Sequence, residues 1–134
     1  MSASAIPDLN TLPSNAVQAR GTLTVETLAR LAEAGGHRWV LADLAHSADR
    51  EALFGAIGCA FGLPKWFGAN LDALYDSLRD LIGANDSPGF VIVLEQLRGT
   101  RALDPQQRAA LLDVFRDAAE FAADRAVAWR VFYD

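Results

Sequence analysis

The chain has 134 residues, 51% of them hydrophobic and 22% charged, so one compact domain with a substantial core is expected. Its 17 acidic and 12 basic residues give a net charge of −5. This disfavours direct binding to nucleic acid or to an anionic membrane, because neutralising phosphates needs clustered Lys and Arg. The single cysteine excludes an intrachain disulfide. With no signal-peptide pattern and no apolar run of about 18 residues, the sequence predicts a cytoplasmic protein.

The first third of the chain reads as a leader, a helix and a strand. Residues 1–22 show no sustained hydrophobic period and are expected to form a loose leader, part of which packs on the domain. A helical pattern covers residues 24–34 and stops at two glycines. Residues 38–44 form a nearly continuous apolar run, which predicts a strand buried on both faces.

Two helices are predicted next. Ser47 is expected to cap the first, which buries Leu53, Phe54, Ile57 and Phe61 and ends before Pro64. Asn70 is expected to cap the second. On that second helix three aspartates stand four residues apart and stack on one face, opposite an apolar stripe: Asp72, Asp76 and Asp80. Like charges at this spacing cost about 0.2–0.5 kcal/mol per pair. The row is therefore either a solvated face or a surface for a cationic partner.

The last third of the chain predicts two more strands around a long helix. Residues 90–94 are short, β-branched and wholly apolar, as in a central strand. Asp104-Pro105 begins a helix that runs to about Asp124, and residues 127–133 alternate as a strand. Strands separated by helical crossovers predict an α/β fold with a small three-stranded parallel sheet packed with helices.

The sequence contains several residue types that are common in active sites, but no pattern places them together in one site. Glu95 ends the predicted central strand, where active-site carboxylates of α/β proteins often lie, and pairing with Asp72 or Asp76 would create an acid/base dyad. His37 and His46 lie too far apart to be ligands on one helical face and are interpreted as surface residues, while Cys59 is interpreted as a buried small hydrophobe. No catalytic residue, metal ligand or cofactor site is predicted.

One stretch resembles a known family. It reads Leu-Pro, two aromatics, Gly, any residue, Asn-Leu-Asp-Ala-Leu, an aromatic, Asp, any residue and Leu, with the two aromatics at Trp66 and Phe67, and it occupies residues 63–78. This pattern resembles barstar, a family of intracellular inhibitors of a bacterial ribonuclease. Weaker matches lie at residues 93–95 and 114–117. The resemblance implies a barstar-like domain at residues 37–134, preceded by an extension at 1–36 that contains the helix at 24–34.

The resemblance also implies a mode of action. The acidic helix and the loop before it would plug the active site of a basic ribonuclease, without catalysis, cofactor or contact with nucleic acid, and a monomer is favoured. Asp76 would face the enzyme's Arg and Lys residues where the RNA phosphate binds, and Asp72 would be a second acceptor. The implied partner-binding residues are Trp66, Asn70, Asp72, Tyr75, Asp76 and Asp117.

Three departures from the family pattern bear on the partner. Ala69 stands where an acidic residue is usual, Tyr75 replaces a tryptophan, and Ser77 replaces a cysteine. They leave open an alternative in which the same fold is an interaction module with a partner other than a ribonuclease. That alternative includes self-association through Trp66 and Tyr75.

Overall fold

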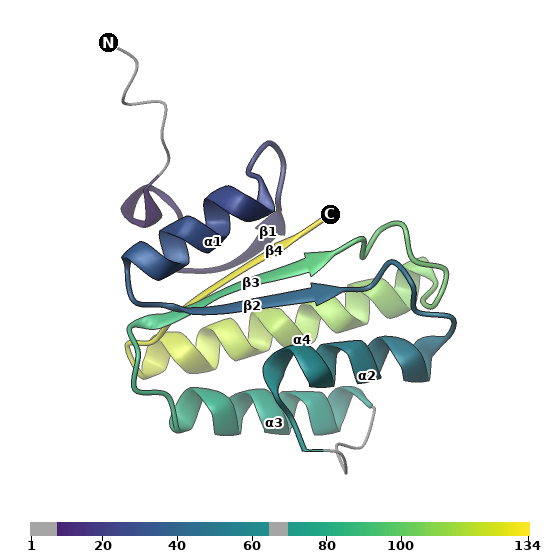
Figure 1. The fold of residues 1–134 in the computed structure, drawn as a ribbon. Helices are drawn as coiled ribbons and strands as arrows, with labels where there is room; N and C mark the ends of the chain where they lie inside the picture. Colours follow the sequence, from purple (N-terminus) through teal and green to yellow (C-terminus); the bar gives the residue numbers. More distant parts are fainter. Residues whose placement is uncertain (1–7, 65–69) are drawn as a thin grey trace.

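The computed structural model describes residues 8–64 and 70–134, and within them four parallel strands form a single sheet (Figure 1). The strands follow the order β1-β4-β3-β2. Their bounds are β1 (Asn15–Ala19), β2 (Arg38–Asp43), β3 (Gly89–Glu95) and β4 (Ala128–Tyr133). The helices are α1 (Val25–Ala34), α2 (Arg50–Phe61), α3 (Leu71–Gly83) and α4 (Pro105–Asp124), and a short 3-10 turn, η2, spans Leu9–Thr11.

The α/β class and the parallel sheet are confirmed, but the sheet has four strands rather than three. The additional strand is β1, from a segment expected to be a loose leader, and it pairs with β4 along its whole length. β1 has only five residues, of which four are half-buried and one is exposed. Its hydrophobic pattern is therefore too short and too weak to stand out in the sequence.

The sheet lies between two unequal layers of helices. Helix α1 covers one face, and helices α2 and α4 cover the other, with α3 outside them (Figure 1). The larger part of the core lies on the α2 and α4 side and includes Trp129, Phe90 and Phe115. Every strand runs opposite to the helices, so the N-terminal ends of the strands lie near the C-terminal end of α1 (Figure 1).

The burial of each strand follows its place in the sheet. β3 is buried along nearly its whole length, as predicted for a central strand. β4, predicted to alternate, is buried on both faces because it lies between β1 and β3. The prediction that β2 is buried on both faces was wrong. β2 is an edge strand, and it leaves Arg38, Leu41 and Asp43 exposed.

Side-chain caps fix the helix starts, with one correction. Helix α4 has a capping box, in which Asp104 and Gln107 each accept a hydrogen bond from the other's backbone amide. The cap of α2 is Asp49, whose side chain accepts from the Ala52 amide at 2.8 Å, and not Ser47. Cys59, expected to be buried, is exposed, because α2 turns Leu53, Ile57 and its neighbours inward and Cys59 lies off that stripe. Within residues 8–64 and 70–134 no helix is long and apolar enough to cross a membrane.

Candidate functional site

Helix α3 is the outermost helix of the layer that also contains α2 and α4 (Figure 1). Leu74, Leu78 and Ile82 are fully or almost fully buried, which confirms the predicted core-facing stripe. Asp72 and Asp76 are exposed, as is Asp80 one turn further on. The helix is therefore held by its apolar face and presents its row of carboxylates to solvent.

The start of α3 is set by Asn70, the cap that the sequence predicts. Its side-chain oxygen accepts a hydrogen bond from the Ala73 amide at 2.8 Å, and its backbone carbonyl accepts one from Leu74 at 2.9 Å. Asp72 lies in the first turn, where the positive end of the helix dipole stabilises a carboxylate. Capping thus fixes both the first turn of the helix and the carboxylate on it.

The acidic side chains of this surface have no cationic partner in the described part of the chain. Three ion pairs occur there, Arg20–Asp134, Arg30–Glu26 and Arg116–Asp113. None of them involves Asp72, Asp76 or Asp117, all of which are exposed. All three carboxylates are thus exposed and unpaired with respect to the described cations.

Tyr75 is held in a ladder of alternating aromatic rings and guanidinium groups. It is half-buried, and the Arg79 guanidinium carbon lies 5.6 Å from its ring centroid. The same carbon lies 5.0 Å from the centroid of Phe121 on α4, and Arg125 covers Phe121 at 3.9 Å. Arg79 and Phe121 did not figure in the site inferred from the sequence. An aromatic residue four positions before an arginine on a helix was the signal for the first contact.

Asp117 lies on α4, the helix against which α3 packs. The two helices run side by side in the same direction (Figure 1), and Arg79 of α3 meets Phe121 of α4. Tyr75 and Asp117 each lie four residues before this contact, on α3 and α4 respectively. Asp117 itself is exposed. Of the six residues inferred from the sequence, Trp66 lies outside the described residues.

The alternative acid/base dyad has no geometric support in the described residues. Glu95 is half-buried at the end of β3, where its register partner is Asp43 on β2. No hydrogen bond or ion pair joins Glu95 to Asp72 or Asp76 across the parts of the chain that are described. Nor does this portion contain a group of three or more His, Cys, Asp or Glu residues suited to a metal ion.

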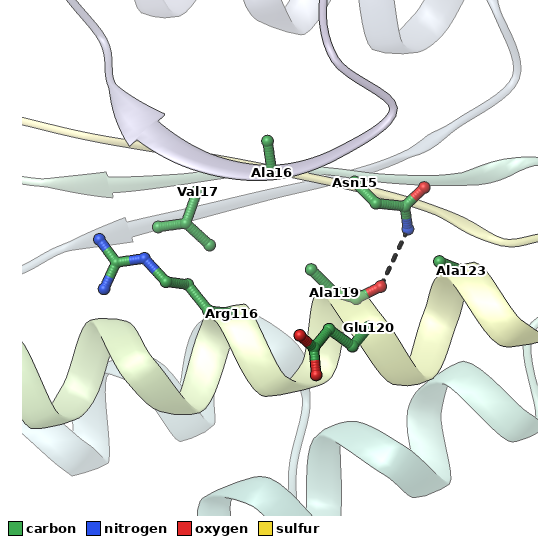
Figure 2. A pocket seen from close by; sticks show the side chains of 7 residues that line it. All are labelled: Asn15, Ala16, Val17, Arg116, Ala119, Glu120 and Ala123. Atoms are coloured by element: carbon green, nitrogen blue, oxygen red, sulfur yellow. Dashed lines mark hydrogen bonds between the residues drawn. The ribbon is translucent and has the colours of Figure 1, made fainter.

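A crevice of about 320 Å³ lies between β1 and α4 and is drawn in Figure 2. Asn15 closes one end by donating hydrogen bonds to the backbone carbonyls of Ala119 at 3.2 Å and Val127 at 2.9 Å. Val17 and Ala123 give it an apolar wall, the Ala16 side chain points away from α4, and Arg116 and Glu120 extend along α4 (Figure 2). The amide of Asn15 is already used by the protein and Arg116 is paired with Asp113, so no polar group of this crevice is singled out as a ligand site.

The fold and this surface define a small α/β protein that presents an acidic helix to solvent. Comparison with family models agrees: the model described as "Barstar (barnase inhibitor)" matches residues 37–134, well over half of the chain. The chain therefore belongs to the barstar family, a family of inhibitors that act on a protein partner. No curated protein matches the sequence. Strand β1 and helix α1 lie N-terminal to the matched region; β1 extends the same sheet, and α1 packs on its other face in a second hydrophobic cluster with Val91, Val93 and Phe132.

Proposed function

We propose that this chain is a cytoplasmic inhibitor, itself without catalytic activity, that blocks the active site of a basic ribonuclease with the acidic surface of α3. Asp76 occupies the position of the RNA phosphate and faces the enzyme's cationic residues. Asp72 is a second acceptor on the preceding turn. Asn70 presents the start of the helix, while Tyr75 and Trp66 supply flat contacts and Asp117 an acidic edge.

The observation that carries this proposal is the exposed carboxylate of Asp76, which forms no ion pair with any residue of 8–64 or 70–134. An ion pair within the chain would have to be broken before a partner's Arg or Lys could bind, at a cost in affinity. Among the described residues, Asp76 has no such pair, and the nearby cation Arg79 is held on aromatic rings. Family membership then favours a ribonuclease as the source of the complementary charge.

The test is the affinity of an Asp76→Ala variant for a basic ribonuclease encoded beside the chain's own gene. A carboxylate at the centre of a desolvated, charge-complementary interface is a hot spot, so the variant should lose at least about 2 kcal/mol of binding free energy. Isothermal titration calorimetry with the purified pair measures this directly. Inhibition of RNA cleavage should weaken by the same factor.

Glu33→Ala is the matched control, since it removes one exposed carboxylate from α1 on the opposite face of the sheet. It changes the net charge equally and should leave affinity within about 0.5 kcal/mol of the parent. An Asp76→Ala variant that binds as tightly as the parent would contradict the proposal. If the chain instead self-associates in sedimentation and ignores the ribonuclease, the alternative of an interaction module with another partner is supported.

A further inference from the structure

Strand β1 leaves one edge of the sheet open. It is the outermost strand and pairs with β4, and no other described strand lies on its outer side. The carbonyl of Ser14 and the amide of Arg20 are hydrogen-bonded to β4, so the even-numbered residues of β1 direct their backbone groups toward β4. Because successive residues of a strand alternate, the N–H and C=O groups of Asn15, Val17 and Ala19 point outward.

This edge carries none of the charges that protect other sheet edges. Natural proteins commonly place charged residues or proline on an edge strand, which prevents a further strand from adding to the sheet. β2, the opposite edge, has exposed Arg38 and Asp43. β1 has no charged residue and no proline between Asn15 and Ala19. In Figure 2, β1 passes in front of the other strands, above α4, so its outer edge is accessible to another strand.

The flank of α4 beside β1 carries one charge of each sign. Arg116 and Glu120 are exposed, lie four residues apart and line the crevice between β1 and α4. Arg116 makes an exposed pair with Asp113 at 3.0 Å, and Glu120 has no ion pair in the described part of the chain. Ala16 lies above the interval between Arg116 and Glu120 (Figure 2). A two-fold axis through Ala16, normal to the sheet, therefore brings Arg116 of one copy opposite Glu120 of the other.

We propose that the chain forms a symmetric dimer in which the two β1 strands pair antiparallel about Ala16. The sheet of one copy then continues into the sheet of the other. Asn15 of each copy faces Val17 of the other, and each such pair exchanges both backbone hydrogen bonds. Ala16 faces its own counterpart in the non-hydrogen-bonded position. Arg116 and Glu120 form an ion pair with the other copy on both sides of the axis.

The position of α4 fits this arrangement. α4 packs against both β1 and β4, so its axis lies beneath the interval between these two strands. Neighbouring strands are about 4.8 Å apart, which places α4 about one strand spacing from the two-fold axis. The two copies of α4 therefore lie about 10 Å apart, close to the separation of packed helices. Half-buried Leu112 and exposed Ala123 share this flank by helical spacing and add apolar surface to the contact.

The dimer leaves the acidic surface of α3 free. Phe121, which meets Arg79 of α3, lies on the other flank of α4. Each copy can therefore bind its own partner protein through α3. Dimerisation and ribonuclease inhibition are separate properties, so loss of either one leaves the other to be measured.

Charge reversal tests the contact between the two copies of α4. In sedimentation equilibrium of the full chain under reducing conditions, the mass should rise with concentration from that of one chain toward that of two. Arg116→Glu and Glu120→Arg should each weaken self-association at least about tenfold, because like charges then meet at both contacts. An equimolar mixture of the two variants should dimerise like the parent, because opposite charges then meet again.

Arg30→Glu is the matched control for Arg116→Glu. Each variant changes the net charge equally and removes one exposed ion pair within a helix, but Arg30 lies on α1, which packs on β2 and β3. It should self-associate like the parent. The proposal is overturned if the parent stays monomeric up to about 1 mM, the weak end of specific binding. It is also overturned if Arg30→Glu weakens the dimer as much as Arg116→Glu, or if the mixture does not recover.

Crosslinking tests the pairing of β1, in a Cys59→Ser background that removes the exposed native thiol. Ala16→Cys should form an intermolecular disulfide on mild oxidation, because the Cα atoms of a non-hydrogen-bonded pair are about 4.5 Å apart, within the range of a disulfide. Gln18→Cys should stay monomeric, because its two copies lie four residues apart along the strands, about 13 Å. No disulfide in Ala16→Cys, or equal crosslinking of Gln18→Cys, would overturn the proposed dimer.

Discussion

The guanidinium carbon of Arg79 lies 5.6 Å from the ring centroid of Tyr75, one helical turn away on α3, and 5.0 Å from that of Phe121 on α4. Arg79 stands between Asp76 and Asp80 in the sequence, yet the structure has no ion pair between it and either carboxylate. The aromatic contacts therefore do two things at once. They join α3 to α4 and keep the helix's own cation on the rings.

We expect Arg79→Met to lower the free energy of unfolding by about 1 kcal/mol, since two cation–π contacts near the surface are lost while the apolar stem is kept. Urea denaturation measures this change. Arg30→Met is the control, because Arg30 makes only a loose, exposed pair with Glu26 at 3.7 Å, and its loss should cost less than about 0.5 kcal/mol. If Arg79→Met is as stable as the parent, the contacts of the Arg79 guanidinium with the two rings do not stabilise the fold.

Two helix-cap variants can distinguish an effect on stability from an effect on partner binding. Asn70→Ala and Asp49→Ala each remove a side chain that accepts from a backbone amide at 2.8 Å, so each should cost about 1 kcal/mol of unfolding free energy. Only α3 belongs to the proposed interface. In calorimetric titrations with the basic ribonuclease, Asn70→Ala should therefore bind more weakly, and Asp49→Ala should bind like the parent. Equal losses of affinity would argue against a special role for the start of α3.

Much of this architecture can be predicted from the sequence wherever a local residue pattern within one helix or strand determines the feature. The buried stripe of α3, the cap at Asn70 and the central place of β3 each depend on a local pattern, and the structure confirms all three. Strand β1 escaped prediction because an edge strand of five residues buries too little to show a clear period. The edge position of β2 was likewise hidden, since strand order depends on long-range packing.

The candidate site, too, could be predicted from the sequence only in part. Helical spacing already placed Asp72 and Asp76 on one face. The contact of Arg79 with Phe121 joins two residues that are 42 positions apart in the sequence, so no local pattern encodes it. The burial of Arg130 on β4, outside the acidic surface, is another feature that the sequence does not predict. A charged residue in an alternating strand is expected to face solvent. Arg130 is buried here because β1 pairs on one side of β4, β3 on the other, and η2 lies over it.

Salt should slow the association of this chain with a basic ribonuclease. The exposed carboxylates of α3 and α4 attract a cationic surface over distances comparable with the Debye length, about 10 Å at 0.1 M salt and 3 Å at 1 M. Stopped-flow measurements across that range should show the association rate constant falling at least tenfold, with a much smaller change in dissociation. If the association rate constant does not change with salt, charge attraction does not speed the association of the two proteins, which contradicts this prediction.

Asp134 should make stability depend on acid pH. Burial alone would raise the pKa of its carboxyl group. Hydrogen bonds from Arg20 and from the Gln96 amide, together with the charges of Arg20 and Arg98, outweigh burial and lower that pKa below its ordinary value of 3.8. Because the folded state favours the ionised form, this contribution is complete above the unfolded pKa. It is lost as the pH falls through the lower folded pKa.

Asp134→Asn should therefore be less stable than the parent at pH 7, by about 1.5 kcal/mol, the low end for a hydrogen bond to a charged group. The difference should shrink as the pH is lowered below 3.8, where the parent's carboxyl also becomes neutral. Urea denaturation at pH 7 and at a series of acid pH values gives both quantities. Asp86→Asn, at an exposed loop position, should differ from the parent by less than about 0.5 kcal/mol throughout. A difference for Asp134→Asn that stays constant with pH would mean that ionisation of Asp134 does not stabilise the joined ends of β1, β3 and β4.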